Sequence, residues 1–327
     1  MTPMRFLALP VLGLALAAGP ATAADEVLIR LNTFPNARAL PFFVGVEKGM
    51  FGKQGLKLEL SFTENSQTLR DGLASGKFDI VHSAVDNAVA MVEMAKVDVV
   101  IVTGGDSGTN EFIVQPEIKS WDDIRGKALV VDAPNTAYAL VGKKILLKQG
   151  LKDGVDYKLN PAGNGTYRFK AMTESKDNAA AVMNLPYSVQ AQELGLKSLG
   201  RTNDMLGPYQ AGGAFVLRSW AQANGPTLER YIAGYVDALR WVMDKRNRAE
   251  AVAILMDKSK LPRPLAERSY DLMIEPGFGF AADAKFNAEG FRNVLAMRAE
   301  VEGGTPQAPE RYLDLSHYDR ALQRLAR

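Results

Sequence analysis

Cysteine is absent from all 327 residues, so the chain has no disulfide framework, no thiolate metal site and no lipidated cysteine. Histidine occurs only at positions 82 and 317, which argues against a zinc site. Neither charge dominates, because 39 basic residues face 37 acidic ones without long blocks of one sign. We therefore expect no nucleic-acid partner. No glycine-rich phosphate loop or dinucleotide fingerprint occurs either, so we expect no metal and no cofactor.

Long apolar runs are also missing, except near the N-terminus. Arg5 precedes the apolar segment Phe6 to Ala18, and small residues at 21–23 lead to Ala24. An apolar run of about 13 residues is too short for a spanning helix, which needs about 20. The pattern predicts a signal peptide at residues 1–23 and an exported, soluble mature protein. Without a cysteine it is not a lipoprotein, and in a bacterium the expected compartment is the Gram-negative periplasm.

Strand and helix patterns alternate along the chain in two successive series. The first series predicts strands at 27–31, 56–62, 78–81 and 97–102, and the second at 112–114, 128–131, 157–159 and 179–183. One more strand is expected at 214–218, followed by helices almost to the end. Such alternation favours an α/β fold with two doubly wound lobes. The expected boundaries are residues 24–109 and 212–327 for lobe 1, which is discontinuous, and 110–211 for lobe 2.

A polar turn at residues 132–136 follows the buried strand predicted at 128–131 and precedes a helix predicted at 136–148. Backbone N–H groups at a helix N-terminus, beside the carboxyl end of a strand, are a frequent ligand site in α/β sheets. Asn135, Thr136 and Tyr138 are therefore candidate contacts for a small molecule. The alternative is an Asn or Thr helix cap with Tyr138 packed on the strand.

Several segments, in this order and spacing, resemble the periplasmic substrate-binding proteins of ABC importers of the nitrate, sulfonate and taurine type. These proteins are related to the binders of thiamine-pyrimidine precursors. The resemblance implies a type II periplasmic binding fold, in which two hinge strands join the lobes and the ligand lies in a cleft between them. The segments are residues 42–51, Gly55-Leu56, 73–80, 123–127 and Leu185-Pro186-Tyr187.

The same resemblance implies where the ligand is contacted. The expected places are the loop after the first strand, the start of the second helix, the turn after the third strand, the turn at 132–138 and the aromatic residue after Pro186. In this sequence the corresponding residues are Asn32, Thr33, Asn36, Arg38, Ser66, Gln67, His82, Ser83, Asp86, Asn87, Asn135, Thr136, Tyr138 and Tyr187.

Three of these residues have alternative roles. Arg38 is the natural counter-ion for an anionic ligand, or else a solvated side chain of a polar loop. Asp86 either stabilises a helix start or contacts an amine or ring N–H of the ligand. His82 either contacts the ligand or forms a hydrogen bond within its lobe.

The resemblance implies binding rather than catalysis. We expect a monomeric, periplasmic solute-binding component of an ABC uptake system, which docks transiently on an inner-membrane permease. A sulfonate-like or carboxylate-like anion, or a zwitterion, is the expected ligand. The alternatives are a binder of a pyrimidine-like heteroaromatic, an enzyme of the same fold, and a protein that presents its ligand to a membrane sensor.

Overall fold

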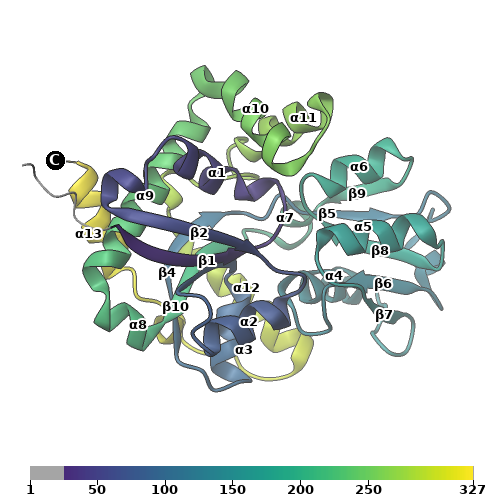
Figure 1. Ribbon diagram of the computed structural model, residues 1–327. Coiled ribbons are helices and arrows are strands. Elements are labelled where there is room, and N and C mark those ends of the chain that lie inside the picture. The colour runs from purple at the N-terminus through teal and green to yellow at the C-terminus, as the bar shows by residue number, and fades with distance from the viewer. Residues whose placement is uncertain (1–25, 327) are drawn as a thin grey trace, which may run out of the picture.

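Two five-stranded sheets with helices around them make up the structure, a computed structural model that describes residues 26–326 (Figure 1). The predicted signal peptide, residues 1–23, lies outside the described residues. Within residues 26–326, no helix combines the length and apolar character needed to cross a bilayer.

The first sheet has the strand order β2-β1-β3-β10-β4 and lies on the left in Figure 1. β1 runs parallel to β2 and β3, whereas β10 is antiparallel to both β3 and β4. Every residue of β3 and β4 is buried, and each strand begins with an apolar run, at 80–81 and at 99–102. The strands are β1 (Val27–Thr33), β2 (Leu56–Phe62), β3 (Ile80–Ala84), β4 (Val99–Asp106) and β10 (Gly212–Leu217).

The second sheet has the order β7-β6-β8-β5-β9. β6 runs parallel to β7 and β8, and β5 is antiparallel to β8 and β9. The strands are β5 (Glu111–Val114), β6 (Ala128–Val131), β7 (Lys158–Pro161), β8 (Asn178–Met183) and β9 (Lys197–Arg201). β9 was not expected from the sequence.

Thirteen α-helices are found within residues 26–326. They are α1 (Leu40–Glu47), α2 (Ser66–Ala74), α3 (Asp86–Glu93), α4 (Ala137–Lys148), α5 (Gly165–Glu174), α6 (Tyr187–Glu193), α7 (Thr202–Leu206), α8 (Arg218–Ala223), α9 (Gly225–Met243), α10 (Arg248–Ser259), α11 (Arg263–Met273), α12 (Ala288–Glu302) and α13 (Ser316–Leu325). α9 packs against α1 and α13.

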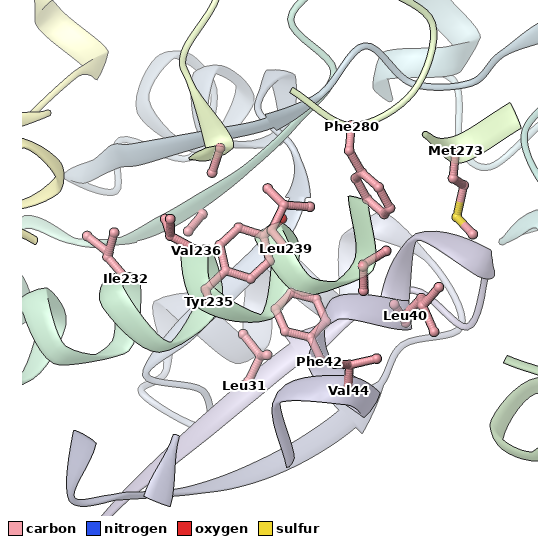
Figure 2. Packing of buried hydrophobic residues seen from close by; sticks show 14 of the residues in the cluster. Leu31, Leu40, Phe42, Val44, Ile232, Tyr235, Val236, Leu239, Met273 and Phe280 are labelled. Carbon is pink, nitrogen blue, oxygen red and sulfur yellow. The ribbon is translucent and has the colours of Figure 1, made fainter. Parts of the chain in front are cut away.

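The core of the first sheet lies beneath α1 and α9 (Figure 2). The rings of Phe42 and Tyr235 stack there with centroids 5.3 Å apart. A second apolar cluster joins the two sheets, because it contains Val81 of β3, Leu129 of β6 and Phe291 of α12. α12 also packs against α4, so this C-terminal helix contacts elements around both sheets.

The third strand lies later in the chain than predicted. The sequence indicated residues 78–81 and a turn containing His82 and Ser83, whereas β3 covers Ile80–Ala84 and includes both. The reason is that β3 lies between β1 and β10. Its pairing with β10 and its burial continue through Ala84, beyond the apolar residues Ile80 and Val81. His82 and Ser83 therefore point from a rigid strand rather than from a turn.

Candidate functional site

A cleft between the two sheets contains about 400 Å³ of empty space, including its opening to solvent. One side comes from β3, α3 and the loop after β1. The other comes from the turn after β6, the start of α4, α5 and the segment after β8. The lining residues are Phe34, Asn36, Arg38, Ser66, Ser83, Ala84, Asn87, Asp132, Thr136, Ala137, Tyr138, Gly165, Arg168 and Asn184.

Direct hydrogen bonds join the two sides around this cleft. The Ser66 backbone N–H at the start of α2 donates to Asp132 Oδ2 at 3.0 Å. The Asn164 N–H donates to the Glu64 carbonyl at 2.8 Å, and the Tyr187 hydroxyl donates to the Pro35 carbonyl at 2.8 Å. The two halves therefore touch in a closed arrangement.

Arg38 is not solvated, which corrects one of the two roles left open for it. Its side chain is 11% exposed, and Nη1 donates to Asp106 Oδ1 at the end of β4 at 2.7 Å. Burial would lower the pKa of the guanidinium, but the Asp106 carboxylate outweighs this effect and the pKa is raised. Arg38 is thus a permanent buried cation at the cleft.

Arg168 of α5 is a second buried cation, and the sequence did not indicate it. Its relative exposure is 4%, and Nη1 donates to the Gly163 carbonyl at 2.9 Å. Burial lowers its pKa below the usual arginine value. The guanidinium carbons of Arg38 and Arg168 each lie 5.9 Å from the centroid of the Tyr138 ring, within the range of cation–π attraction.

Six buried polar atoms of the lining have no hydrogen-bond partner among residues 26–326. Buried polar groups normally have partners, so such a concentration indicates a place where a ligand or water supplies them. The three donors are Arg38 Nε, Arg168 Nε and the Tyr138 hydroxyl, and the three acceptors are the Oδ1 atoms of Asn87, Asp132 and Asn184.

A second hollow, with about 310 Å³ of empty space including its opening to solvent, shares Arg38 and Ser83 with the cleft. Thr33, Phe42, His82, Asp106 and Tyr235 contribute to its lining. The His82 ring contacts Phe42 edge-on, with centroids 5.1 Å apart, and lies 4.5 Å from the Tyr235 ring. Burial, with a further contribution from Arg38, lowers the pKa of His82 to about 3, so the ring is neutral at physiological pH.

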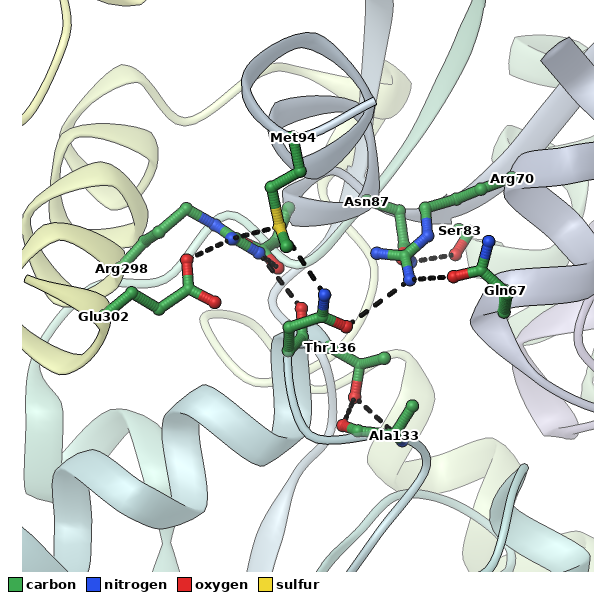
Figure 3. Close-up of polar contacts among 11 residues, drawn as sticks. Gln67, Arg70, Ser83, Asn87, Met94, Ala133, Thr136, Arg298 and Glu302 are labelled. Carbon is green, nitrogen blue, oxygen red and sulfur yellow. Dashed lines mark hydrogen bonds and ion pairs between the residues drawn. The ribbon is translucent and has the colours of Figure 1, made fainter. Parts of the chain in front are cut away.

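Thr136 lies in the cleft lining, but its side chain does not cap α4. Its hydroxyl donates to the Ala133 carbonyl at 2.8 Å and accepts from the Ala133 N–H at 3.4 Å, which fixes the turn after β6 (Figure 3). Thr136 is the N-cap residue of α4 by position, as the threonine-cap interpretation expected, but its side chain makes no capping hydrogen bond.

Five predicted residues lie outside the linings of both cavities. Asn32 Nδ2 donates to Ser61 Oγ at 2.9 Å within the first sheet, and Tyr187 bonds to the loop after β1 as described. Gln67 and Asn135 accept hydrogen bonds from Arg70 in a groove between α2 and α3 (Figure 3). The fifth, Asp86, is treated next.

Asp86 forms a buried ion pair with Arg298 of α12. The Arg298 Nε and Nη2 atoms donate to the two carboxylate oxygens at 2.7 Å each. Nη2 also donates to the Asn135 carbonyl at 3.2 Å, and Nη1 pairs with Glu302 (Figure 3). The structure therefore gives Asp86 a partner about 200 residues away that no local sequence pattern could indicate.

The structure brings Asn36, Arg38, Ser66, Ser83, Asn87, Thr136 and Tyr138 together at the cleft, and Thr33 and His82 at the adjoining cavity. Sequence reasoning missed Phe34, Asp132, Arg168 and Asn184. Asp132 belongs to the turn already singled out, so its position at the end of a buried strand was a usable signal. Arg168 lies in an ordinary amphipathic helix, and nothing local marks it as buried.

Solved structures share this architecture at low sequence identity. The periplasmic nitrate-binding protein of Synechocystis PCC 6803 is 14% identical, with a TM-score of 0.76 over 92% of this chain and 89% of its own. The ligand-binding component of an ABC-type import system from Staphylococcus aureus, with zinc bound, is 14% identical, with a TM-score of 0.74 over 90% and 99%.

The alkanesulfonate-binding protein of Xanthomonas axonopodis pv. citri, bound to MOPS, is 17% identical, with a TM-score of 0.67 over 85% of this chain and 91% of its own. No curated protein matches the chain significantly. The structural likenesses confirm the predicted periplasmic binding fold. Because the model of the NMT1-like family matches residues 22–256 of the 327, the chain belongs to that family.

Proposed function

We propose that this chain is the solute-binding component of an ABC uptake system. It captures a small organic molecule with a carboxylate or sulfonate group in the cleft and delivers it to an inner-membrane permease. The observation that carries this proposal is the set of six unpartnered buried polar atoms around one cleft. Two of these atoms belong to the guanidinium groups of Arg38 and Arg168. The names of the matched nitrate-binding and sulfonate-binding proteins support the same class of ligand.

The mechanism follows from the closed arrangement. A ligand that accepts from Arg168 Nε and the Tyr138 hydroxyl satisfies donors on the α4 and α5 side, while Arg38 and Asn87 belong to the other side. A ligand held from both sides stabilises closure by its differential affinity for the closed form. The binding step makes and breaks no covalent bond, so the proposal is binding rather than catalysis.

A thermal-shift screen of sulfonates, carboxylates and pyrimidines, with native mass spectrometry of the purified protein, tests this proposal. A ligand at 100 times its Kd stabilises the folded state by about 2.7 kcal/mol. We expect stabilisation by members of the anionic classes. Stabilisation by pyrimidines alone favours the heteroaromatic binder, and turnover of a bound compound into a product contradicts the proposal.

The proposed location is the periplasm, with residues 1–23 removed as a signal peptide and a monomeric mature chain. We predict that the exported protein starts at Ala24, because a small residue at position 23 ends the apolar segment. N-terminal sequencing of the envelope fraction from a Gram-negative host measures this. Recovery of the chain with Met1 intact would contradict export by this route.

A further inference from the structure

We propose that Met94 is an oxidation site, and that its sulfoxide strengthens the contact between the two sides of the cleft. This inference goes beyond the proposed function and does not depend on the identity of the ligand. It rests on the exposure of one methionine and on two polar contacts of its sulfur atom.

Met94 is the only exposed methionine among residues 26–326. Its relative exposure is 54%, whereas the other described methionines are buried or half-buried. It is the C-cap residue of α3, and it lines the groove between α2 and α3 together with Met91 and Asn135. Oxidation of a methionine depends on access to its sulfur, so an oxidant in solution reaches Met94 before the other described methionines.

The sulfur atom of Met94 faces two N–H donors from outside α3 (Figure 3). Asn135 Nδ2, in the turn after β6, lies 3.5 Å from Met94 Sδ, and Arg298 Nη1 of α12 lies 3.8 Å from it. A thioether sulfur is a weak acceptor, so both contacts are weak hydrogen bonds. The contact with Asn135 joins α3, which packs on β3 and β4 of the first sheet, to a turn of the second sheet.

Oxidation by hydrogen peroxide turns this weak acceptor into a strong one. A lone pair of the sulfur attacks one peroxide oxygen, an S–O bond forms and the O–O bond breaks. The departing hydroxide takes the proton of the new S–OH group and leaves as water. Sulfur loses the two electrons that the peroxide gains, and the product is methionine sulfoxide, which reductases with a thiol donor convert back to methionine.

The positions of the two nitrogen atoms suit a sulfoxide oxygen. An N–H···O hydrogen bond has an N···O distance of about 2.9 Å, which is shorter than the present N···S distances, so an oxygen on this side of Sδ reaches Asn135 and Arg298. Arg298 Nη1 carries a second N–H for Glu302, so this ion pair is kept. A bond from the guanidinium is charge-assisted and therefore stronger than a neutral one. The sulfoxide thus adds hydrogen bonds that favour the closed arrangement.

Peptide mapping of the protein after treatment with hydrogen peroxide tests the site. Cleavage after Glu93 places Met91 and Met94 in separate peptides, so mass spectrometry follows the oxidation of each one. Met91 is 1% exposed and is the matched buried control. We expect Met94 to be oxidised about ten times faster than Met91 or more, because susceptibility follows exposure. Oxidation of Met94 at the rate of Met91 overturns the assignment.

Hydrogen–deuterium exchange of the ligand-free protein tests the consequence. We expect the turn at 132–136 to exchange about three times more slowly after oxidation, because the sulfoxide holds Asn135 against α3 and local opening becomes rarer. Reduction by methionine sulfoxide reductases with a thiol should restore the original rate. The Met94→Leu variant keeps every other methionine, so the same treatment should leave its exchange unchanged.

Asn135→Asp is a second variant, because it keeps an oxygen for Arg70 Nη2 and lacks the Nδ2 donor. Oxidation should slow exchange clearly less in this variant than in the parent protein. Unchanged or faster exchange in the parent protein after oxidation of Met94 overturns the inference. Slowing that persists in Met94→Leu assigns the effect to another methionine and also overturns it. Full slowing in Asn135→Asp overturns the contact with Asn135. No ligand is added, so each of these results leaves the proposed function standing.

Discussion

The Tyr138 ring and the two guanidinium groups beside it set the chemical character of the cleft at the scale of single residues. Arg38 and Arg168 are far apart in the chain, on opposite sides of the cleft, and both come within 5.9 Å of this ring. Their burial removes water as a hydrogen-bond partner, so each unpartnered nitrogen gains more from a ligand oxygen than it would at the surface.

Tyr138→Phe should weaken ligand binding about 5-fold to 10-fold, because it removes one donor that only the ligand satisfies. Tyr209→Phe is a matched control. Tyr209 also has a buried, unpartnered hydroxyl, but it lies outside the cleft lining. Calorimetry with a ligand from the screen should show a loss for the first variant only. Equal losses in both would place the effect in packing rather than in ligand contact.

His82 should make stability depend on pH. Its pKa falls from 6.5 in the unfolded chain to about 3 in the folded protein. Between these pH values the imidazole is protonated in the unfolded state and neutral in the folded state. The stability contribution is complete above pH 6.5 and falls by about 1.4 kcal/mol per pH unit between pH 6.5 and 3.

The His82→Gln variant removes this group. The free energy of unfolding of the parent protein should fall between pH 7.5 and pH 4.5. In the variant we expect this loss to be smaller by about 2 to 3 kcal/mol. Urea unfolding at both pH values measures the difference, and His317→Gln serves as the control with the second histidine. An identical pH dependence with and without His82 would show that the imidazole is protonated freely in the folded state.

At the scale of elements, α12 connects helices that belong to different sheets. Arg298 binds Asp86 at the start of α3 and the Asn135 carbonyl in the turn before α4. Removal of one partner from a buried ion pair typically costs about 3 to 5 kcal/mol, since the other charge stays buried alone.

Arg298→Met should therefore lower the free energy of unfolding by about 3 kcal/mol. Arg248→Met, which breaks the exposed pair with Asp271, should cost less than about 1 kcal/mol. The double variant Arg298→Met with Asp86→Asn should recover part of the loss, because the uncompensated carboxylate is gone. Equal losses for the buried and the exposed arginine in urea unfolding would contradict a structural role of α12 in joining the two sides.

Most elements were predictable from the sequence because their ends carry local signals. β2 and β6 match the predicted residues 56–62 and 128–131, and the side chain of Asn65 caps α2, a local signal of the same kind. β9 was missed because Lys197–Arg201 shows no apolar alternation, which an exposed edge strand does not need. Its pairing with β5 is a tertiary property.

The candidate site was predictable only in part, and for a related reason. Local pattern placed Thr136 and Tyr138 near a helix start, and the family resemblance implied Arg38. The structure collects all three in one lining. The roles of Asp106 and Arg168 depend on which elements face each other after folding. Burial of a charged side chain has no signature in its immediate neighbours in the chain.

For the whole molecule, we propose that residues 24–109 with 212–327 form one lobe and residues 110–211 the other. The two sheets use strands from these ranges, and the cleft lies between them. Besides the apolar cluster that joins the two sheets, polar contacts such as Ser66 with Asp132 and Asn164 with Glu64 hold the closed form. Such contacts exchange readily with water when the lobes separate.

We predict that a saturating ligand reduces the radius of gyration in small-angle scattering, because it favours the closed form over a more open one. Asn164→Ala, which loses the hydrogen bond from Asn164 Nδ2 to the Thr63 carbonyl at 3.2 Å, should enlarge the ligand-free protein or leave it unchanged. It should not abolish compaction by ligand. If a confirmed ligand causes no compaction and the ligand-free protein is not already closed, this hinge motion is contradicted.

The place of β10 in the first sheet fixes an order of events during synthesis. β4 pairs only with β10 in that sheet, and β10 begins at Gly212, more than a hundred residues after β4 ends at Asp106. While the chain emerges from the ribosome, β3 and β4 therefore have no common neighbour until the whole second sheet has been made. The first sheet therefore completes its strand pairing only after residues 212–217 have been made, which makes this sheet the later of the two to close.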